Sequence, residues 1–130
     1  MNETIKNPPA VFTDACESIG LSLSDDEIAA CGRFLGLLLE TNRKFNLTAI
    51  TDPEQAWRRH VLESLALLPF VKDARHVADV GSGGGLPGIP LAIAAPQTQV
   101  TLIESTGKKA RFLEQVAAEL ELGNVRVVND

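Results

Sequence analysis

Apolar residues recur every three or four positions through the first part of the chain, which is the spacing of one face of an α-helix. A polar tail is expected before the pair Pro8-Pro9, and Pro69 is expected to end the last helix. The pattern predicts three helices, over about residues 10–19, 25–43 and 53–68. We therefore interpret residues 1–70 as a helical cap.

Residues typical of helix ends stand at the expected places. Ser24 with Glu27 matches a capping box, and Asp52 with Gln55 matches a second one. Gly20 suits the left-handed position that follows a helix. The positions expected to face the core are Val11, Phe12, Ala15, Cys16 and Ile19 in the first helix, Ile28, Cys31, Phe34, Leu35 and Leu38 in the second, and Ala56, Trp57, His60 or Val61, Leu65 and Leu68 in the third.

From Val77 the pattern changes to short apolar runs that alternate with helical segments, which is typical of an α/β fold with parallel strands. Strands are predicted at Val77–Val80, Val100–Ile103 and Val125–Val128, and helices at about Pro87–Ala95 and Gly107–Leu122, the latter stopped by Gly123. Residues 71–130 then form the first half of a doubly wound sheet, continuous with the helical cap.

The strand order raises the question of what covers the first strand. In a doubly wound sheet the first strand is central, and its far neighbour comes from later sequence. An apolar strand left at an edge promotes association. We therefore expect either that the chain is the front part of a longer protein or that it self-associates through the uncovered sheet edge.

Composition limits the binding partners and the compartment that are expected for the protein. The chain has 130 residues, 45% of them hydrophobic, and a net charge of −5, which opposes bulk attraction to nucleic acid or anionic membranes but allows a local basic patch. Its longest apolar runs are far too short to span a bilayer, and no signal peptide is evident. Cys16 and Cys31 lack metal-ligand spacing and fit a core in a reducing cytoplasm.

The stretch from His76 to Gly88 places a glycine-dense turn between a strand and a helix, the geometry that holds a nucleotide-like ligand. Gly83, Gly85 and Gly88 formally match the dinucleotide pattern. That pattern, however, starts where the strand ends, at Gly81, and counting from there puts Leu86 at the third glycine position. An NAD-dependent oxidoreductase is therefore disfavoured.

Two carboxylates flank this turn. Asp79, at the end of the first strand, would repel a pyrophosphate and suits a ligand with positive charge, such as the ammonium and sulfonium of S-adenosylmethionine. Glu104, at the end of the second strand, could accept hydrogen bonds from a ribose diol. Both could instead be helix caps or solvated strand-end groups.

A resemblance becomes specific once these segments are taken together. They resemble the ribosomal small-subunit RNA methyltransferase family, also called the glucose-inhibited division protein B family. The resemblance covers the chain from about residue 21 and rests on the blocks Asn46-Leu47-Thr48-Ala49-Ile50, Arg59-His60-Val61-Leu62-Glu63-Ser64, Asp79-Val80-Gly81-Ser82-Gly83-Gly84-Gly85-Leu86-Pro87-Gly88-Ile89-Pro90-Leu91, Glu104-Ser105, Gly107-Lys108-Lys109 and Arg111-Phe112-Leu113.

This resemblance implies a Rossmann-like fold and transfer of a methyl group from S-adenosylmethionine to guanine N7 in 16S ribosomal RNA of the small ribosomal subunit. By position, Gly81 and Leu86 resemble cofactor contacts, and Gly83 and Glu104 are expected to line the same pocket. The family's segments that contact the adenine and the target guanine are expected beyond Asp130. A non-catalytic fragment that binds cofactor or RNA therefore stays open as an alternative.

The methyl transfer implied for the family requires mainly that the chain align the methyl donor with the target base. Guanine N7 carries a lone pair and no proton, so no general base is required, and we assign no catalytic residue. RNA contact must come from local basic groups. The main candidates are Arg59, His60, Lys108 and Lys109, with Arg43, Lys44, Arg58 and Arg111 as further basic groups.

Overall fold

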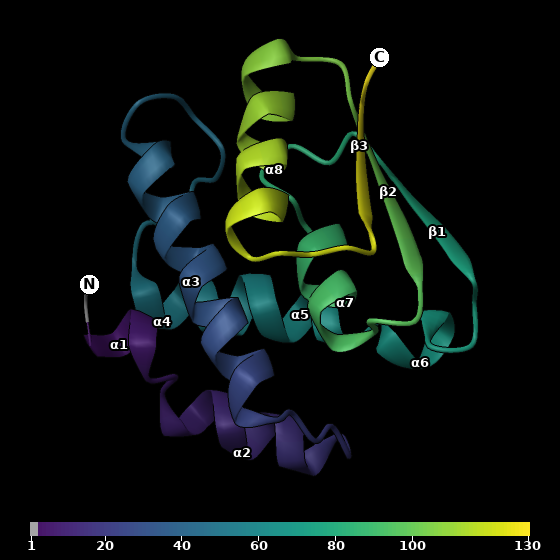
Figure 1. Cartoon of the computed structure of the whole chain (residues 1–130). Coiled ribbons are helices and arrows are strands. Elements are labelled where there is room, and N and C mark those ends of the chain that lie inside the picture. Colours follow the sequence, from purple (N-terminus) through teal and green to yellow (C-terminus); the bar gives the residue numbers. More distant parts are fainter. Residues whose placement is uncertain (1–2) are drawn as a thin grey trace.

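The computed structural model describes residues 3–130, which form a group of helices on one side of a three-stranded parallel sheet (Figure 1). The strands β1 (His76–Val80), β2 (Gln99–Glu104) and β3 (Val125–Asn129) lie in the order β1-β2-β3. The predicted fold class is confirmed: a helical cap is followed by the first half of a Rossmann-like sheet.

The first helices differ from the prediction at the N-terminus. Residues expected to be a polar tail form the one-turn helix α1 (Glu3–Lys6), which buries Ile5. The Trp57 indole stabilises this helix, because its N–H donates a hydrogen bond of 2.7 Å to the Thr4 carbonyl. A single apolar residue in a polar segment gave no periodic signal, which explains the error.

The next two helices follow the prediction closely. Helix α2 (Ala10–Ser18) is capped by Ile19 and followed by Gly20, whose φ of 75° is the left-handed conformation expected there. Helix α3 (Asp25–Asn42) begins with the reciprocal capping box of Ser24 and Glu27. On α2, Phe12 and Cys16 are buried, whereas Val11 and Ile19 are exposed and only in part match the expected face.

The third predicted helix is divided into several pieces. These are α4 (Pro53–Gln55), the π-helix η1 (Ala56–Leu62), α5 (Glu63–Leu65) and, after a turn, α6 (Leu68–Val71). Asp52 caps the start, as predicted, by accepting from the Gln55 N–H at 3.0 Å. Pro69 does not end the helix but lies in the first turn of α6, where its missing N–H has no cost.

The burial pattern of this segment fits either helix type. Trp57, Val61 and Leu65 are four residues apart and all buried, and residues at this spacing share one face of an α-helix as well as of a π-helix. His60, offered as an alternative to Val61, is only half-buried. Sequence periodicity alone does not separate a π-helix from an α-helix.

Two helices connect the strands and cover one face of the sheet. Helix α7 (Gly88–Ala94) follows β1, and α8 (Gly107–Glu119) follows β2. Helix α8 ends earlier than predicted. Glu121, at φ 54°, ends the helix in the left-handed conformation in place of the predicted stop at Gly123, since the N–H groups of Glu121 and Leu122 return to carbonyls in the last turn of α8.

Residues from both halves of the chain share one hydrophobic core. Helix α3 packs against α7 and α8, and Arg33 of α3 donates a hydrogen bond of 2.9 Å to the carbonyl of Glu119. The largest fully buried side chains are Trp57, Phe12, Phe34, Leu35, Leu38, Leu65, Ile89, Leu102, Leu113, Val61, Val100 and Val116.

The opposite face of the sheet and the β1 edge are open within residues 3–130. Strand β1 pairs only with β2 in that range, and Val80 is 77% exposed. The predicted uncovered edge is therefore present in this part of the chain, and self-association through it stays a prediction. No helix within residues 3–130 is long and apolar enough to cross a membrane.

Candidate functional site

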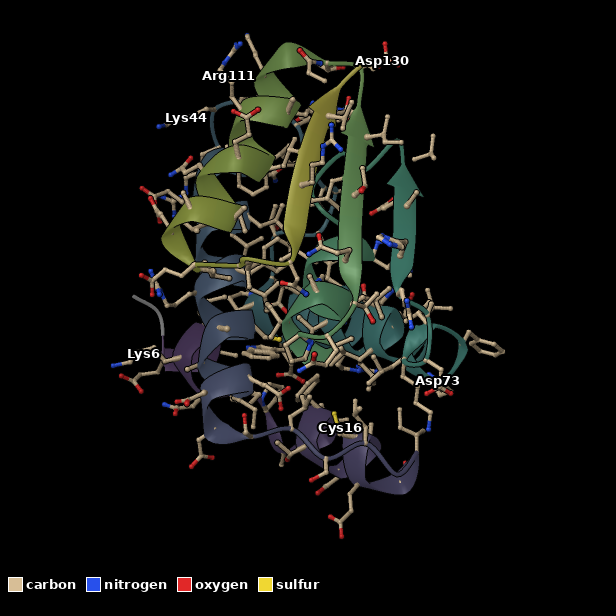
Figure 2. All side chains as sticks on the ribbon, turned by 45° about the vertical axis from the view of Figure 1, so that its right-hand side comes forward. Lys6, Cys16, Lys44, Asp73, Arg111 and Asp130 are labelled. Atoms are coloured by element: carbon tan, nitrogen blue, oxygen red, sulfur yellow. The ribbon has the colours of Figure 1, made fainter. Side chains whose placement is uncertain are left out.

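The glycine-dense turn lies at the carboxyl ends of the strands, the end at which Figure 2 labels Asp130. The chain leaves β1 at Gly81, whose N–H donates to the carbonyl of Ile103 at 2.8 Å. Gly81, Gly83 and Gly85 have φ values of 77°, 55° and 91°. These values lie in the left-handed region, where a residue with a Cβ is strained, so the turn requires glycine at all three positions.

The first half of the turn has open space beside its backbone. A Cβ built on Gly81 meets no other atom within 4 Å, and one built on Gly83 meets only the carbonyl oxygen of Gly81 at 3.9 Å. These two glycines are thus not required by packing. Their backbone is accessible to a flat or extended ligand.

The second half of the turn is packed against the core. A Cβ on Gly84 would approach Leu38 Cδ1 to 3.0 Å, and one on Gly85 would lie 2.8 Å from Ile89 Cγ1. At Gly88 a Cβ would overlap the side chain of Leu102 and lie 2.8 Å from Asp79 Oδ2. These glycines bring helices α3 and α7 against the turn and the sheet.

Glu104 connects the end of β2 to the turn. Its Oε1 accepts from the Gly83 N–H at 2.8 Å, and its Oε2 accepts from the Thr106 N–H at 2.8 Å. The pKa of this carboxyl is lowered, mainly by the Thr106 N–H and also by the Gly83 N–H and the charge of Lys109, although burial acts in the opposite direction. The side chain is 5% exposed and is ionised.

Asp79 lies beneath the turn. Its Oδ2 accepts from the N–H of Gly88 at 3.0 Å, so the carboxylate joins β1 to the first residue of α7. Burial raises the pKa of Asp79, and the hydrogen bond from Gly88 opposes that shift. Ser82 adds a second local link, because its hydroxyl donates to the Asp79 carbonyl at 2.8 Å.

The segment after α3 packs against the same turn. Asn42 Oδ1 accepts from the N–H groups of Leu47 and Thr48 at 2.7 and 2.9 Å, and Thr48 Oγ1 lies 2.7 Å from His60 Nε2. The Leu47 carbonyl would lie 3.3 Å from a Cβ on Gly84. His60, predicted as an RNA contact, therefore supports this loop, and burial lowers its pKa.

The other predicted basic contacts fall into two places. Arg59 is exposed on η1 and forms a 3.5 Å ion pair with Glu63. Lys108 and Lys109 lie at the start of α8, next to the turn. There Lys108 Nζ is 6.0 Å from the centre of the Phe45 ring, and the charge of Lys109 acts on Glu104.

Leu86, the remaining predicted contact, is half-buried and packs against the core, and its peptide bond to Pro87 is cis. Two hollows of about 840 and 430 Å³ lie elsewhere, the larger along α3 and the smaller beside α2, and neither is lined by a residue of the turn. Beside Gly81 and Gly83 the turn forms an open ledge, since a Cβ at either position would meet almost nothing.

Comparison with known proteins identifies the family. Residues 27–130 match the model of the GidB family, described as rRNA small subunit methyltransferase G. The chain belongs to this family. It is 51% identical over 123 residues to the ribosomal RNA small subunit methyltransferase G of Sorangium cellulosum, and 46% identical over 124 residues to that of Nitrosospira multiformis.

The GidB relatives are considerably longer than this chain. The match covers 92% of the chain but 52% of the Sorangium protein, and 95% of the chain but 57% of the Nitrosospira protein. A third relative, the methyltransferase G of Pseudomonas aeruginosa, is 44% identical over 113 residues, which are 53% of its length. The chain spans about half the length of these curated relatives.

Two residues that shape the site were not among the predicted ones. Asn42 holds the loop after α3, and Thr48 joins that loop to His60. The one available signal was an asparagine at the end of a long helix, a residue type whose side chain often bonds nearby backbone. The chain distance between Thr48 and His60 gave no indication of their contact.

Proposed function

We propose that the turn at Gly81–Gly88 binds S-adenosylmethionine and that the protein methylates guanine N7 of 16S ribosomal RNA in the cytoplasm. The observation that carries the proposal is the open backbone at Gly81 and Gly83, next to the ionised Glu104. A family of ribosomal RNA methyltransferases requires a methyl donor, and this ledge at the carboxyl ends of parallel strands is where such folds bind nucleotide-like ligands.

The residues of the ledge fit that cofactor. Gly81 and Gly83 leave the space that a side chain would fill, and we propose the half-buried Leu86, which packs against the core, as an apolar contact. Glu104 uses one lone pair of each oxygen for the turn and retains others for a ribose diol. Asp79 keeps Oδ1 free of any hydrogen bond among residues 3–130, and its negative charge favours a cationic ligand.

The proposed reaction needs alignment more than proton transfer. S-adenosylmethionine supplies an electrophilic methyl group on a sulfonium. Guanine N7 would attack this methyl group with its own lone pair while the carbon–sulfur bond breaks and S-adenosylhomocysteine leaves, so the chain needs no base, and we assign no residue to proton transfer. Asp79 and Glu104 fix the turn and its charge. We propose Arg59, His60, Lys108 and Lys109 as RNA contacts; His60 also holds the loop after α3 through Thr48.

Calorimetric titration tests the cofactor assignment. The chain should bind S-adenosylhomocysteine and not NAD. Replacement of Gly81 by Val should abolish this binding while helix content, measured by circular dichroism, stays nearly intact. Binding of NAD alone, or unchanged affinity in Gly81→Val, would contradict the assignment.

A second candidate is a cofactor- or RNA-binding unit without turnover. A methyl-transfer assay on 30S subunits separates the two. Incorporation of labelled methyl groups at guanine N7 supports the enzyme. Binding of S-adenosylhomocysteine without any incorporation supports the binding unit.

A further inference from the structure

Positive charge is concentrated in two segments that border the turn. Residues 43–51 and 105–111 hold five of the chain's twelve basic residues and no acidic one, although the whole chain carries a net charge of −5. The acids directly adjoining them have local partners, since Glu104 is buried on the turn and Asp52 caps α4, whereas Glu40 and Glu114 lie three residues outside the two segments.

The structure brings these segments to the same end of the molecule. Figure 2 shows Lys44 and Arg111 at the end where Asp130 lies, whereas Lys6 and Asp73 lie at the opposite end. The contact of Lys108 Nζ with the Phe45 ring joins the loop after α3 to α8. We call Lys44, Lys108, Lys109 and Arg111 the basic rim.

The basic rim is held in place and available for a ligand. The loop that carries Lys44 is anchored through Asn42 and Thr48, and the guanidinium of Arg111 folds back to the first residue of α8, where a Cβ on Gly107 would lie 3.4 Å from it. Lys44, Lys108 and Arg111 are exposed, and no rim residue forms a salt bridge with any other residue in the range 3–130.

We infer that the basic rim binds the phosphate backbone of the RNA substrate on either side of the target base. The inference rests on the proposed function, since a target base beside a cofactor bound at Gly81 and Gly83 brings its flanking phosphates within reach of the neighbouring side chains. An RNA fits better than a membrane because the large exposed hydrophobic residues, Val11, Ile19, Leu67, Phe70 and Val80, all lie outside the two basic segments.

A pair of matched double variants tests this inference on the full chain. Lys44→Glu/Arg111→Glu removes two rim cations, and Lys6→Glu/Lys72→Glu makes the same change in charge on exposed residues elsewhere. Binding of a short fluorescein-labelled single-stranded RNA is measured by anisotropy between about 50 and 200 mM KCl.

The rim variant should bind this RNA about 10-fold more weakly at the lowest salt. It should also reduce the slope of log affinity against log salt by about 1.4, since each lost single-strand phosphate contact removes about 0.7. The control variant should stay within about 2-fold of the parent, because long-range charge effects are screened in this range.

Equal losses in both variants, or no RNA binding by the parent chain, would overturn the inference. If the parent binds phosphatidylserine vesicles but not RNA, and the rim variant loses the vesicle binding, the basic rim would be a membrane-binding surface instead. Titration of both variants with S-adenosylhomocysteine separates this result from the cofactor proposal. If the rim variant binds both S-adenosylhomocysteine and RNA as the parent does, the RNA role of the basic rim is refuted and the cofactor proposal is unaffected. If the rim variant loses RNA binding, the role of the basic rim is supported, even where the parent does not bind the cofactor.

Discussion

The two halves of the glycine-rich turn use the same residue for different reasons. At Gly84, Gly85 and Gly88 a side chain would meet the core, so packing favours glycine, and at Gly85 the left-handed φ requires it as well. At Gly81 and Gly83 the space beside the backbone is open, and glycine is required there by the left-handed φ. The first group positions α7 against the sheet, and the second leaves a surface for a ligand.

This difference shows that a glycine motif mixes structural and binding information. In our proposal only the open glycines mark the position of the ligand, and Glu104 connects to that half through the Gly83 N–H. Substitutions in the packed half should therefore affect folding first. Substitutions in the open half should affect binding first.

Gly88→Ala should have the largest effect on stability. The added Cβ would overlap Leu102 and press on Asp79 Oδ2, and overpacking of this kind costs about 3 kcal/mol. Urea unfolding followed by circular dichroism measures the change. Gly123→Ala is the control, because a Cβ there meets nothing within 4 Å, and it should change stability by less than about 0.5 kcal/mol. Equal losses in the two variants would contradict the packing role of Gly88.

Glu104→Gln should cost about 2 kcal/mol, because the new NH₂ group must face the N–H of either Gly83 or Thr106 and leaves one donor unpaired. The folded-state pKa of Glu104 is lowered, so its contribution is present above its ordinary pKa and is lost as the pH falls through the folded value. The variant should consequently lose less stability on acidification than the parent does.

Urea unfolding at several acidic pH values measures this difference. Glu114→Gln, on the exposed surface of α8, serves as the control. A parent and a Glu104→Gln variant with parallel acid profiles would show that the carboxylate does not hold the turn.

Gly81→Ala should cost about 1 kcal/mol, the strain of a left-handed alanine. Gly20→Ala is a closely matched control, since Gly20 has a φ of 75° and equally open surroundings. Both variants should lose similar stability in urea, but only Gly81→Ala should weaken binding of S-adenosylhomocysteine. Equal affinities of the two variants for S-adenosylhomocysteine would contradict a binding site in this half of the turn.

His60→Gln should have the smallest effect, and it should depend on pH. Burial lowers the pKa of His60 in the folded state, so the unfolded chain takes up the proton first as the pH falls through about 6.5, and stability decreases. The variant should lose less stability between neutral and mildly acidic pH. His76→Gln, an exposed position, is the control, and identical profiles for His60→Gln and the parent would contradict the assignment.

Much of this architecture could be predicted from the sequence because its signals are local. The capping box of Ser24 and Glu27 and the strand before Gly81 each lie within a few residues. The features that were wrong or missed depend on distant contacts. Helix α1 needs the Trp57 indole, and the loop after α3 needs His60, and neither contact leaves a periodic pattern.

The end of α8 shows a different limit. Gly123 was the expected stop, but Glu121 takes the left-handed position because the helix ends where the chain must turn towards β3. In the glycine turn, the sequence could not separate the open glycines from the packed ones. That distinction depends on Leu38, Ile89 and Leu102, which come from three different elements.

Amide chemical shifts test the central claim most directly. In a ¹H–¹⁵N correlation experiment, titration with S-adenosylhomocysteine should move the signals of Gly81 and Gly83 most, with Gly20 and Gly123 unchanged. Shifts confined to the groove along α3, around Arg33 and Leu37, would place the ligand elsewhere and contradict the division of the turn into a packed half and a binding half.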